Sequence, residues 1–200
     1  MPAIILKQIQ KTLVIRFNRP AIRSPLSIDV LKRLDFVLDN VLTDESIKAI
    51  IFTGTGDVFA SGADLREIAE TNAQKAKEFA IRGQKLMAKI SRLQQKTIAA
   101  INGYCYGGAL DLALVCDLRI AAQDATFSHP GAGLGIITGW GGTQRLPRLI
   151  GQAKALEMFF TVTPVTADEA LRIGLIDIIS NDIIAESLTN INAGHSSHSL

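Results

Sequence analysis

Cysteine is scarce in this sequence, which has only Cys105 and Cys116 among its 200 residues. Neither lies in a CxxC pair or at a metal-ligand spacing from a histidine, which argues against a disulfide framework and a zinc site. Both lie among small and apolar residues, so we expect buried structural thiols. The sequence therefore predicts a cytoplasmic protein with no bound metal.

A charge excess and a long hydrophobic run are also lacking. The 21 Lys and Arg residues against 19 Asp and Glu leave a net charge of +2, which argues against a dedicated nucleic-acid binder. The longest apolar stretch, residues 98–115, is interrupted by Asn102 and Asp111, whereas a membrane span needs about 20 largely apolar residues. The N-terminal MPAIILKQIQ has no basic n-region and no Arg/Ser-rich amphipathic character. We expect no membrane segment and no targeting signal.

Apolar residues, in contrast, make up 48% of the chain, enough for the core of one domain. Short β-rich runs alternate with helical stripes, which predicts an α/β fold. Ser27 is the expected N-cap of a helix that runs to about Leu42, and Asn72 that of a later long helix. The other expected helices are 142–150, 152–160 and 167–173, and the expected strands are 4–9, 12–17, 49–53, 97–101, 117–121 and 175–179. Periodicity fades beyond this point, so residues 181–200 are predicted to form a short, frayed polar tail.

Two segments are dense in glycine and alanine just before an expected helix, ASGAD at 60–64 and GGA at 107–109. The first amides of a helix have no internal acceptor and lie at its positive end. Two such amides that converge on one oxygen form an oxyanion hole, which stabilises charge developing on a carbonyl. The same glycines also fit tight turns and close helix–sheet packing, so both interpretations stay open.

Three blocks of the sequence resemble one family, in that family's order. They are FASGADL at 59–65, the segment 100–112 that contains INGY and GGALDL, and GGTQRL at 141–146. These blocks are similar to the signatures of the enoyl-CoA hydratase/isomerase (crotonase) family. The resemblance covers residues from about 4 to 180. It implies an α/β crotonase-like spiral of ββα units over residues 1–180, assembled as a homotrimer or a dimer of trimers. It also implies a shortened C-terminal helical region, and hence an acyl pocket that is more open, covered by neighbouring subunits, or impaired.

The resemblance further implies an acyl-CoA thioester as substrate, with coenzyme A entering as part of that substrate and no separate cofactor. The thioester carbonyl would accept hydrogen bonds from the backbone amides of Ala63 and Gly108. Ala63, Asp64, Leu65 and Arg66 would run beside the pantetheine arm.

The acid–base positions depart from the family pattern. Hydratases of the family use two glutamates, but the first position here is Asp111, one methylene shorter, and the second is Gly131, within FSHPG at 127–131. A displacement of about 1 Å can lower a catalytic rate on the order of a hundredfold, and glycine transfers no proton. His129 is a candidate acid–base group, since an unperturbed imidazole has a pKa of about 6.5. It also fits a hydrogen-bonded loop histidine, and an external base such as bicarbonate in the space at Gly131 is a further alternative.

Two other features have a functional and a structural interpretation. Gly131 and Trp140 are expected to line the acyl pocket, although a tryptophan also fits a plain core position. Arg82, Lys85, Lys89 and Arg92 share one helical face. We expect this face to be solvated rather than to contact RNA.

The sequence therefore predicts an acyl-CoA enzyme that stabilises a thioester enolate, most like an enoyl-CoA hydratase/isomerase. Asp111 is the first candidate for proton transfer and His129 the second. The alternatives are an acyl-CoA-binding protein with impaired catalysis and a crotonase-type decarboxylase or thioester hydrolase, because one fold hosts several reactions.

Overall fold

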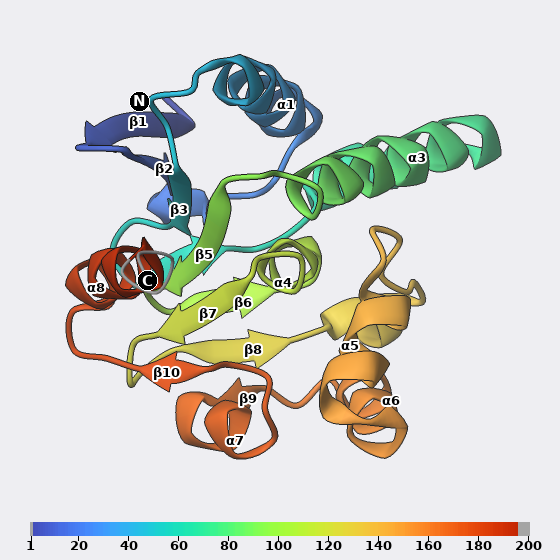
Figure 1. Ribbon diagram of the computed structural model, residues 1–200. Coiled ribbons are helices and arrows are strands. Elements are labelled where there is room, and N and C mark those ends of the chain that lie inside the picture. Colours follow the sequence, from blue (N-terminus) through green and yellow to red (C-terminus); the bar gives the residue numbers. More distant parts are fainter. Residues whose placement is uncertain (1, 196–200) are drawn as a thin grey trace.

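The computed structural model describes residues 2–195, which form two sheets surrounded by helices (Figure 1). The larger sheet has six strands in the order β1-β2-β3-β5-β7-β10, and the smaller has four in the order β4-β6-β8-β9. The strands of the larger sheet are β1 Ile4–Ile9, β2 Thr12–Phe17, β3 Ala49–Thr53, β5 Lys96–Ile101, β7 Leu118–Ala121 and β10 Ile178–Ile179. Those of the smaller sheet are β4 Val58–Ala60, β6 Tyr104–Tyr106, β8 Thr126–Ser128 and β9 Val165–Thr166.

The chain builds both sheets at once. It passes from β3 to β4, then through helices α2 (Leu65–Ala69) and α3 (Ala73–Ile90) to β5 and β6, and then through α4 (Gly108–Ala113) to β7 and β8. Each turn adds one parallel strand to each sheet. The structure thus confirms the predicted spiral of ββα units, which places the starts of α2 and α4 after neighbouring strands of the smaller sheet.

Local sequence explains the first helix and the central strand. All five residues of β3 are buried, as expected for an apolar run with parallel neighbours on both sides. Helix α1 (Ile28–Thr43) begins at Ser27, whose hydroxyl accepts a hydrogen bond from the Val30 amide at 3.4 Å. Its buried residues form one apolar stripe and are Val30, Leu31, Leu34, Val37, Leu38 and Val41.

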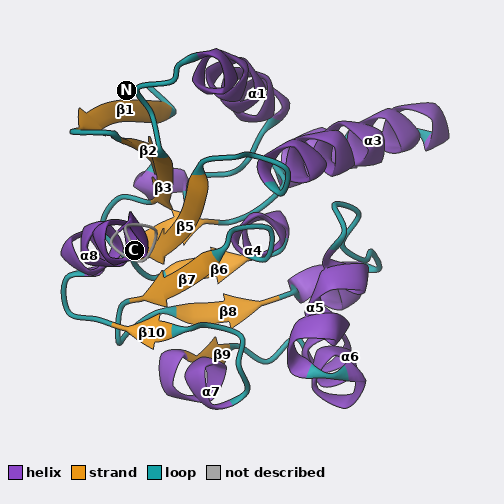
Figure 2. Ribbon diagram, viewed as in Figure 1, coloured by secondary structure: helices purple, strands orange, loops and turns teal. Residues whose placement is uncertain are grey.

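Helix α3 packs through its second half and extends from the body of the molecule (Figure 2). Asn72 caps it as predicted, accepting a hydrogen bond from the Lys75 amide at 2.9 Å. On the basic face, Lys89 forms ion pairs with Asp35 and Asp39 of α1. Lys89 therefore joins α3 to α1. That the basic face does not bind nucleic acid stays a prediction.

The predicted polar tail is wrong for most of its length, because Ile183–His195 form helix α8. Ile183 and Ile191 are buried in a second apolar cluster with β-sheet residues such as Ile98, and Leu188 packs against it. Ser, Thr and Asn residues between the apolar positions interrupt the helical stripe, so the sequence alone did not predict this helix. Residues 196–200 of the predicted tail lie outside the described residues.

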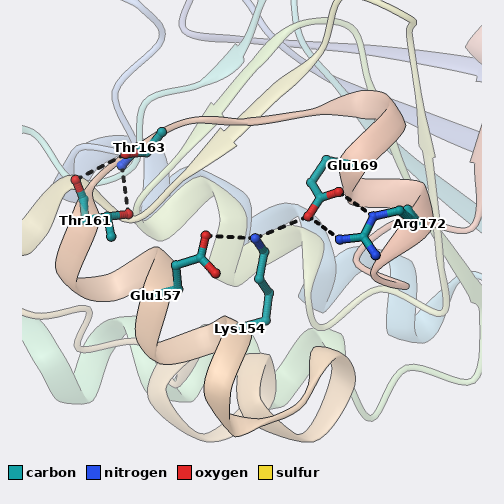
Figure 3. A network of polar contacts seen from close by, with 6 residues as sticks. All are labelled: Lys154, Glu157, Thr161, Thr163, Glu169 and Arg172. Atoms are coloured by element: carbon teal, nitrogen blue, oxygen red, sulfur yellow. Dashed lines mark hydrogen bonds and ion pairs between the residues drawn. The ribbon is translucent and has the colours of Figure 1, made fainter.

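Helices α5 (Gly142–Ile150), α6 (Gln152–Thr161) and α7 (Ala167–Arg172) follow β8. Lys154 of α6 lies between Glu157 and Glu169, and Glu169 binds Arg172 through both carboxylate oxygens (Figure 3). Exposed ion pairs of this kind stabilise a fold only slightly. Helix α6 is anchored instead by its buried apolar side chains, among them Phe159.

Candidate active site

A cavity of about 280 Å³ opens between α2, α3, the start of α4 and the loop that follows β8. Its lining is mainly apolar and includes Ala63, Gly108, His129, Gly131 and Trp140. These residues come from segments up to 77 positions apart in the chain. The spiral fold therefore gathers most of the predicted site residues around one space.

The two segments rich in small residues touch beside this cavity. A Cβ atom on Gly62 would lie 2.5 Å from the backbone nitrogen of Gly108, and Gly62 has a φ of +80°. Only glycine fits this combination of close approach and left-handed backbone. Within residues 2–195, the amides of Ala63 and Gly108 donate to no acceptor. Two free donors thus lie close together at the cavity wall.

Asn102 links the two turns that precede the segments rich in small residues. Its side-chain oxygen accepts a hydrogen bond from the Gly54 amide at 2.8 Å, and its amide nitrogen donates to the carbonyls of Gly56 and Val58. The turn between β3 and β4 is thereby fixed against the turn between β5 and β6. Asn102 belongs to one of the three motif blocks, but the sequence alone predicts no role for it.

Trp140 is a wall of the cavity and is only 2% exposed. Its ring lies directly against the Cα atoms of Gly83 in α3 and Gly108 in α4, where any side chain would collide with it. Phe79 flanks the indole at a centroid distance of 5.3 Å. Trp140 is therefore both a packed core residue and a residue that lines the cavity, so the two interpretations of its role both apply.

Asp111 lies behind the cavity wall rather than on it. Its side chain is fully buried and is absent from the residues that line the space. The Thr138 hydroxyl donates to Oδ2, and Gly142 packs against the carboxylate without room for a side chain. Burial raises the Asp111 pKa from the usual 3.8 to about 7, although the Thr138 hydrogen bond and the charge of Arg145 act in the opposite direction. The backbone amide of Trp140 also favours the charged carboxylate, which lowers the Asp111 pKa slightly.

His129 lies between Asp111 and the cavity. His129 lines the cavity although it is only 3% exposed, and its Nε2 lies 3.6 Å from Oδ1 of Asp111. Burial lowers the His129 pKa from the usual 6.5 to about 4, so the imidazole is neutral at physiological pH. Phe159 packs on the ring at a centroid distance of 5.1 Å. The side chain makes no hydrogen bond shorter than 3.5 Å within the described residues, and the two interpretations of His129 stay predictions.

Gly131 leaves the cavity without a carboxylate at the family's second position. It lines the cavity, and a Cβ atom there would lie 2.7 Å from the carbonyl oxygen of Ile136. The backbone here is thus folded tightly around glycine. A second, smaller cavity of about 130 Å³ is also lined by His129 and Gly131.

The three residues after Ala63 differ in whether they line the cavity. Asp64 is the N-cap of α2 and accepts a hydrogen bond from the Arg66 amide at 3.0 Å. Leu65 is 55% exposed and lines the cavity. The Arg66 side chain is exposed, pairs with Asp64 at 2.7 Å, and does not line the cavity.

The groups that surround Asp111 were not predicted from the sequence. Thr138 and Arg145 had no assigned role, and Gly142 was quoted only as part of the GGTQRL block. The signal for Gly142 and Arg145 was present in that block, since both act on the carboxylate. Thr138 carried no sequence signal.

Neither a metal centre nor a membrane span is evident in the part of the chain that the structure describes. No three His, Cys, Asp or Glu side chains in residues 2–195 converge as metal ligands. Over the same residues, no helix has both the length and the apolar character that a bilayer crossing needs. Cys105 and Cys116 are both buried and unpaired, as the sequence predicts.

Comparisons with known proteins agree with this architecture. The chain is 42% identical over 175 residues to the short-chain-enoyl-CoA hydratase of Clostridium acetobutylicum and, equally, to the crotonyl-CoA hydratase of Syntrophomonas wolfei. Each match covers 87% of this chain and 67% of the relative, so the chain spans about two thirds of their length. The crystal structure of an enoyl-CoA hydratase from Bacillus anthracis superposes with a TM-score of 0.91 at 33% identity, covering 96% of this chain and 76% of that one. Pseudomonas aeruginosa DspI gives the same TM-score at 32% identity, covering 96% and 80%.

The family model for enoyl-CoA hydratase/isomerase matches residues 8–190, nearly the whole chain. Together with the ββα spiral and the order of the three sequence blocks, this match confirms the predicted resemblance. The chain belongs to the enoyl-CoA hydratase/isomerase family.

Proposed function

We propose that this chain binds acyl-CoA thioesters and stabilises the enolate that forms from them, with hydration of an enoyl-CoA as its reaction. One observation carries the proposal: the free amides of Ala63 and Gly108 lie close together at the wall of an apolar cavity. Such donors stabilise the negative oxygen of an enolate, and each is typically worth several kcal/mol in such sites. The neighbouring apolar wall suits an acyl chain.

The proton-transfer groups of the proposal are Asp111 and His129. Coenzyme A is bound only as part of the substrate, with Ala63, Leu65 and the adjacent backbone beside its pantetheine arm. Lyase and isomerase chemistry both pass through the same enolate, so the proposal covers either outcome at the double bond. No further cofactor is assigned.

Incubation with crotonyl-CoA in ¹⁸O-labelled water tests this function. We expect labelled 3-hydroxybutyryl-CoA from the wild type and a large loss of product from Asp111→Ala. Equal and negligible turnover by both proteins would contradict a hydratase. Product analysis with malonyl-type and branched acyl-CoAs then separates hydration from decarboxylation and thioester hydrolysis.

Gly131 favours a second candidate, an acyl-CoA-binding protein with impaired catalysis. Nothing at this position can exchange a proton, and the backbone there has no room for a larger residue. Calorimetric binding of acyl-CoA without turnover of a broad acyl-CoA panel would establish this candidate instead.

Assembly and location belong to the same proposal. Exposed apolar side chains such as Ile137 and Phe160, which are 63% and 73% exposed, support self-association into a homotrimer or a dimer of trimers. Sedimentation equilibrium measures this directly. The buried free thiols support the cytoplasm as the site of action.

A further inference from the structure

Two buried polar atoms, one at the cavity wall and one behind it, face each other with no other partner among residues 2–195. They are Oδ1 of Asp111 and Nε2 of His129, 3.6 Å apart. Buried polar atoms in folded proteins nearly always have a hydrogen-bond partner. A contraction of roughly 0.5 Å would bring this pair within ordinary N–H···O distance. Each atom is therefore the natural partner of the other.

We propose that Asp111 and His129 act as one proton-transfer unit, in which Asp111 holds the proton and His129 exchanges it with the substrate. This inference rests on the proposed function and specifies how its acid–base step works. His129 is the catalytic residue of the unit, because it lines the cavity and Asp111 does not. Asp111 is a positioning residue, because it reaches the cavity only through the imidazole.

The surroundings of the pair suit a proton that moves easily. Asp111 accepts a hydrogen bond from the hydroxyl of Thr138 and interacts electrostatically with Arg145 and with the buried thiol of Cys105. The hydroxyl and the guanidinium stabilise the carboxylate, while burial favours the neutral acid. Because these effects oppose each other, neither form is strongly preferred.

The imidazole has a simpler environment. It packs on the apolar ring of Phe159, and burial alone displaces its pKa. A neutral imidazole with one nitrogen toward Asp111 and the other free can accept a proton on one side and release one on the other. The unit thereby extends the reach of the shorter Asp111 side chain into the cavity.

A single unit of this kind can complete hydration without a carboxylate at residue 131. The unit begins with Asp111 as a carboxylate and the imidazole neutral, its Nε2–H directed at Oδ1. As the oxygen of water bonds to the β-carbon, one of its O–H bonds breaks, the free ring nitrogen of His129 takes that proton, and the Nε2 proton passes to Asp111. The π electrons of the double bond move toward the α-carbon and the thioester oxygen. The unit then returns a proton to the α-carbon, so it ends in its initial state and no oxidant or reductant is needed.

Kinetics of Asp111→Asn, His129→Gln and the double variant test the proposal. The measurements are hydration of crotonyl-CoA and exchange of the α-protons of butyryl-CoA with deuterated water. We expect each single variant to lower both rates by a factor on the order of 10² to 10⁴ with unchanged thioester binding. The double variant should lose no more than the larger single loss, because the two residues act as a unit. The control is Asp168→Asn, the same chemical change at an exposed aspartate that contacts Gln123.

Two kinetic outcomes would overturn the proposal. One is α-proton exchange that persists at the wild-type rate in His129→Gln. The other is a double-variant loss equal to the product of the single losses, which would show that the residues act independently.

Nitrogen-15 NMR of the imidazole separates this inference from the proposed function. We expect the Nε2 resonance of His129, assigned by its absence from His129→Gln, to carry the signature of a hydrogen bond to a carboxyl group. That signature should disappear in Asp111→Asn and persist in Asp168→Asn. If the wild type turns over no acyl-CoA, the hydratase proposal fails while this measurement still decides the pairing. A resonance that is identical in wild type and Asp111→Asn would refute it.

Discussion

The dependence of stability on pH offers a demanding test of the buried Asp111–His129 pair. In the folded protein the pKa of Asp111 is about 7 and that of His129 about 4. Their usual values are 3.8 and 6.5. Between about pH 4 and 6.5, the folded pair therefore holds one proton, on Asp111, and the unfolded pair also holds one, on the histidine. Because both states bind the same number of protons, the pair gives the free energy of unfolding no slope in this range.

When either residue of the pair is replaced, the free energy of unfolding should depend on pH through the remaining residue alone. In His129→Gln the raised Asp111 pKa remains, so the folded state binds more protons than the unfolded state between about pH 4 and 7. Stability is then lost as the pH rises through this range. Since a tenfold change in proton affinity corresponds to about 1.4 kcal/mol, the loss amounts to about 4 kcal/mol.

In Asp111→Asn, the free energy of unfolding should change with pH in the opposite direction. The lowered His129 pKa remains there, so the folded state binds fewer protons than the unfolded state between about pH 4 and 6.5. Stability is present above this range and is lost as the pH falls through it, by about 3 kcal/mol.

Urea unfolding of the wild type and both variants, from about pH 4 to about pH 8, measures these slopes. The exposed substitution Asp168→Asn is the control and should follow the wild-type profile. Profiles of both pair variants that run parallel to the wild type would refute the reasoning, because the buried groups would then have ordinary pKa values.

Three other substitutions test the remaining structure. Gly62→Ala should lower the free energy of unfolding by about 2–4 kcal/mol and reduce enoyl-CoA turnover, because its Cβ would press on the Gly108 nitrogen from a left-handed backbone; wild-type values in urea unfolding and turnover assays would contradict the close approach. Gly131→Glu should lower thermal stability without raising the hydration rate, since its Cβ would lie 2.7 Å from the Ile136 carbonyl; a faster enzyme would show that the carboxylate position is accessible. Ile191→Ala should destabilise the protein by about 2–4 kcal/mol in urea unfolding, and no change would mean that α8 is not anchored to the sheet.

Several elements of the fold follow from local interactions that a short stretch of sequence already shows. Cap residues and apolar stripes gave the starts of α1 and α3 and the buried face of α1, because hydrogen bonds and periodicity within one helix are visible in a short window. The three motif blocks identified the family. Apolar periodicity did not predict α8, because polar residues separate its apolar positions. These positions are recognised as a buried face only once the helix packs on the sheet.

The arrangement of the candidate site depends on contacts between distant segments, which no local pattern in the sequence predicts. Sequence patterns named Asp111 and His129 separately, but their pairing depends on a long-range approach between α4 and the end of β8. The same holds for Thr138, which reaches the carboxylate from a loop, and for Trp140, which closes over Gly108. Distances between residues far apart in the chain are set by packing of the whole spiral, and burial displaces a pKa only after that packing has excluded water.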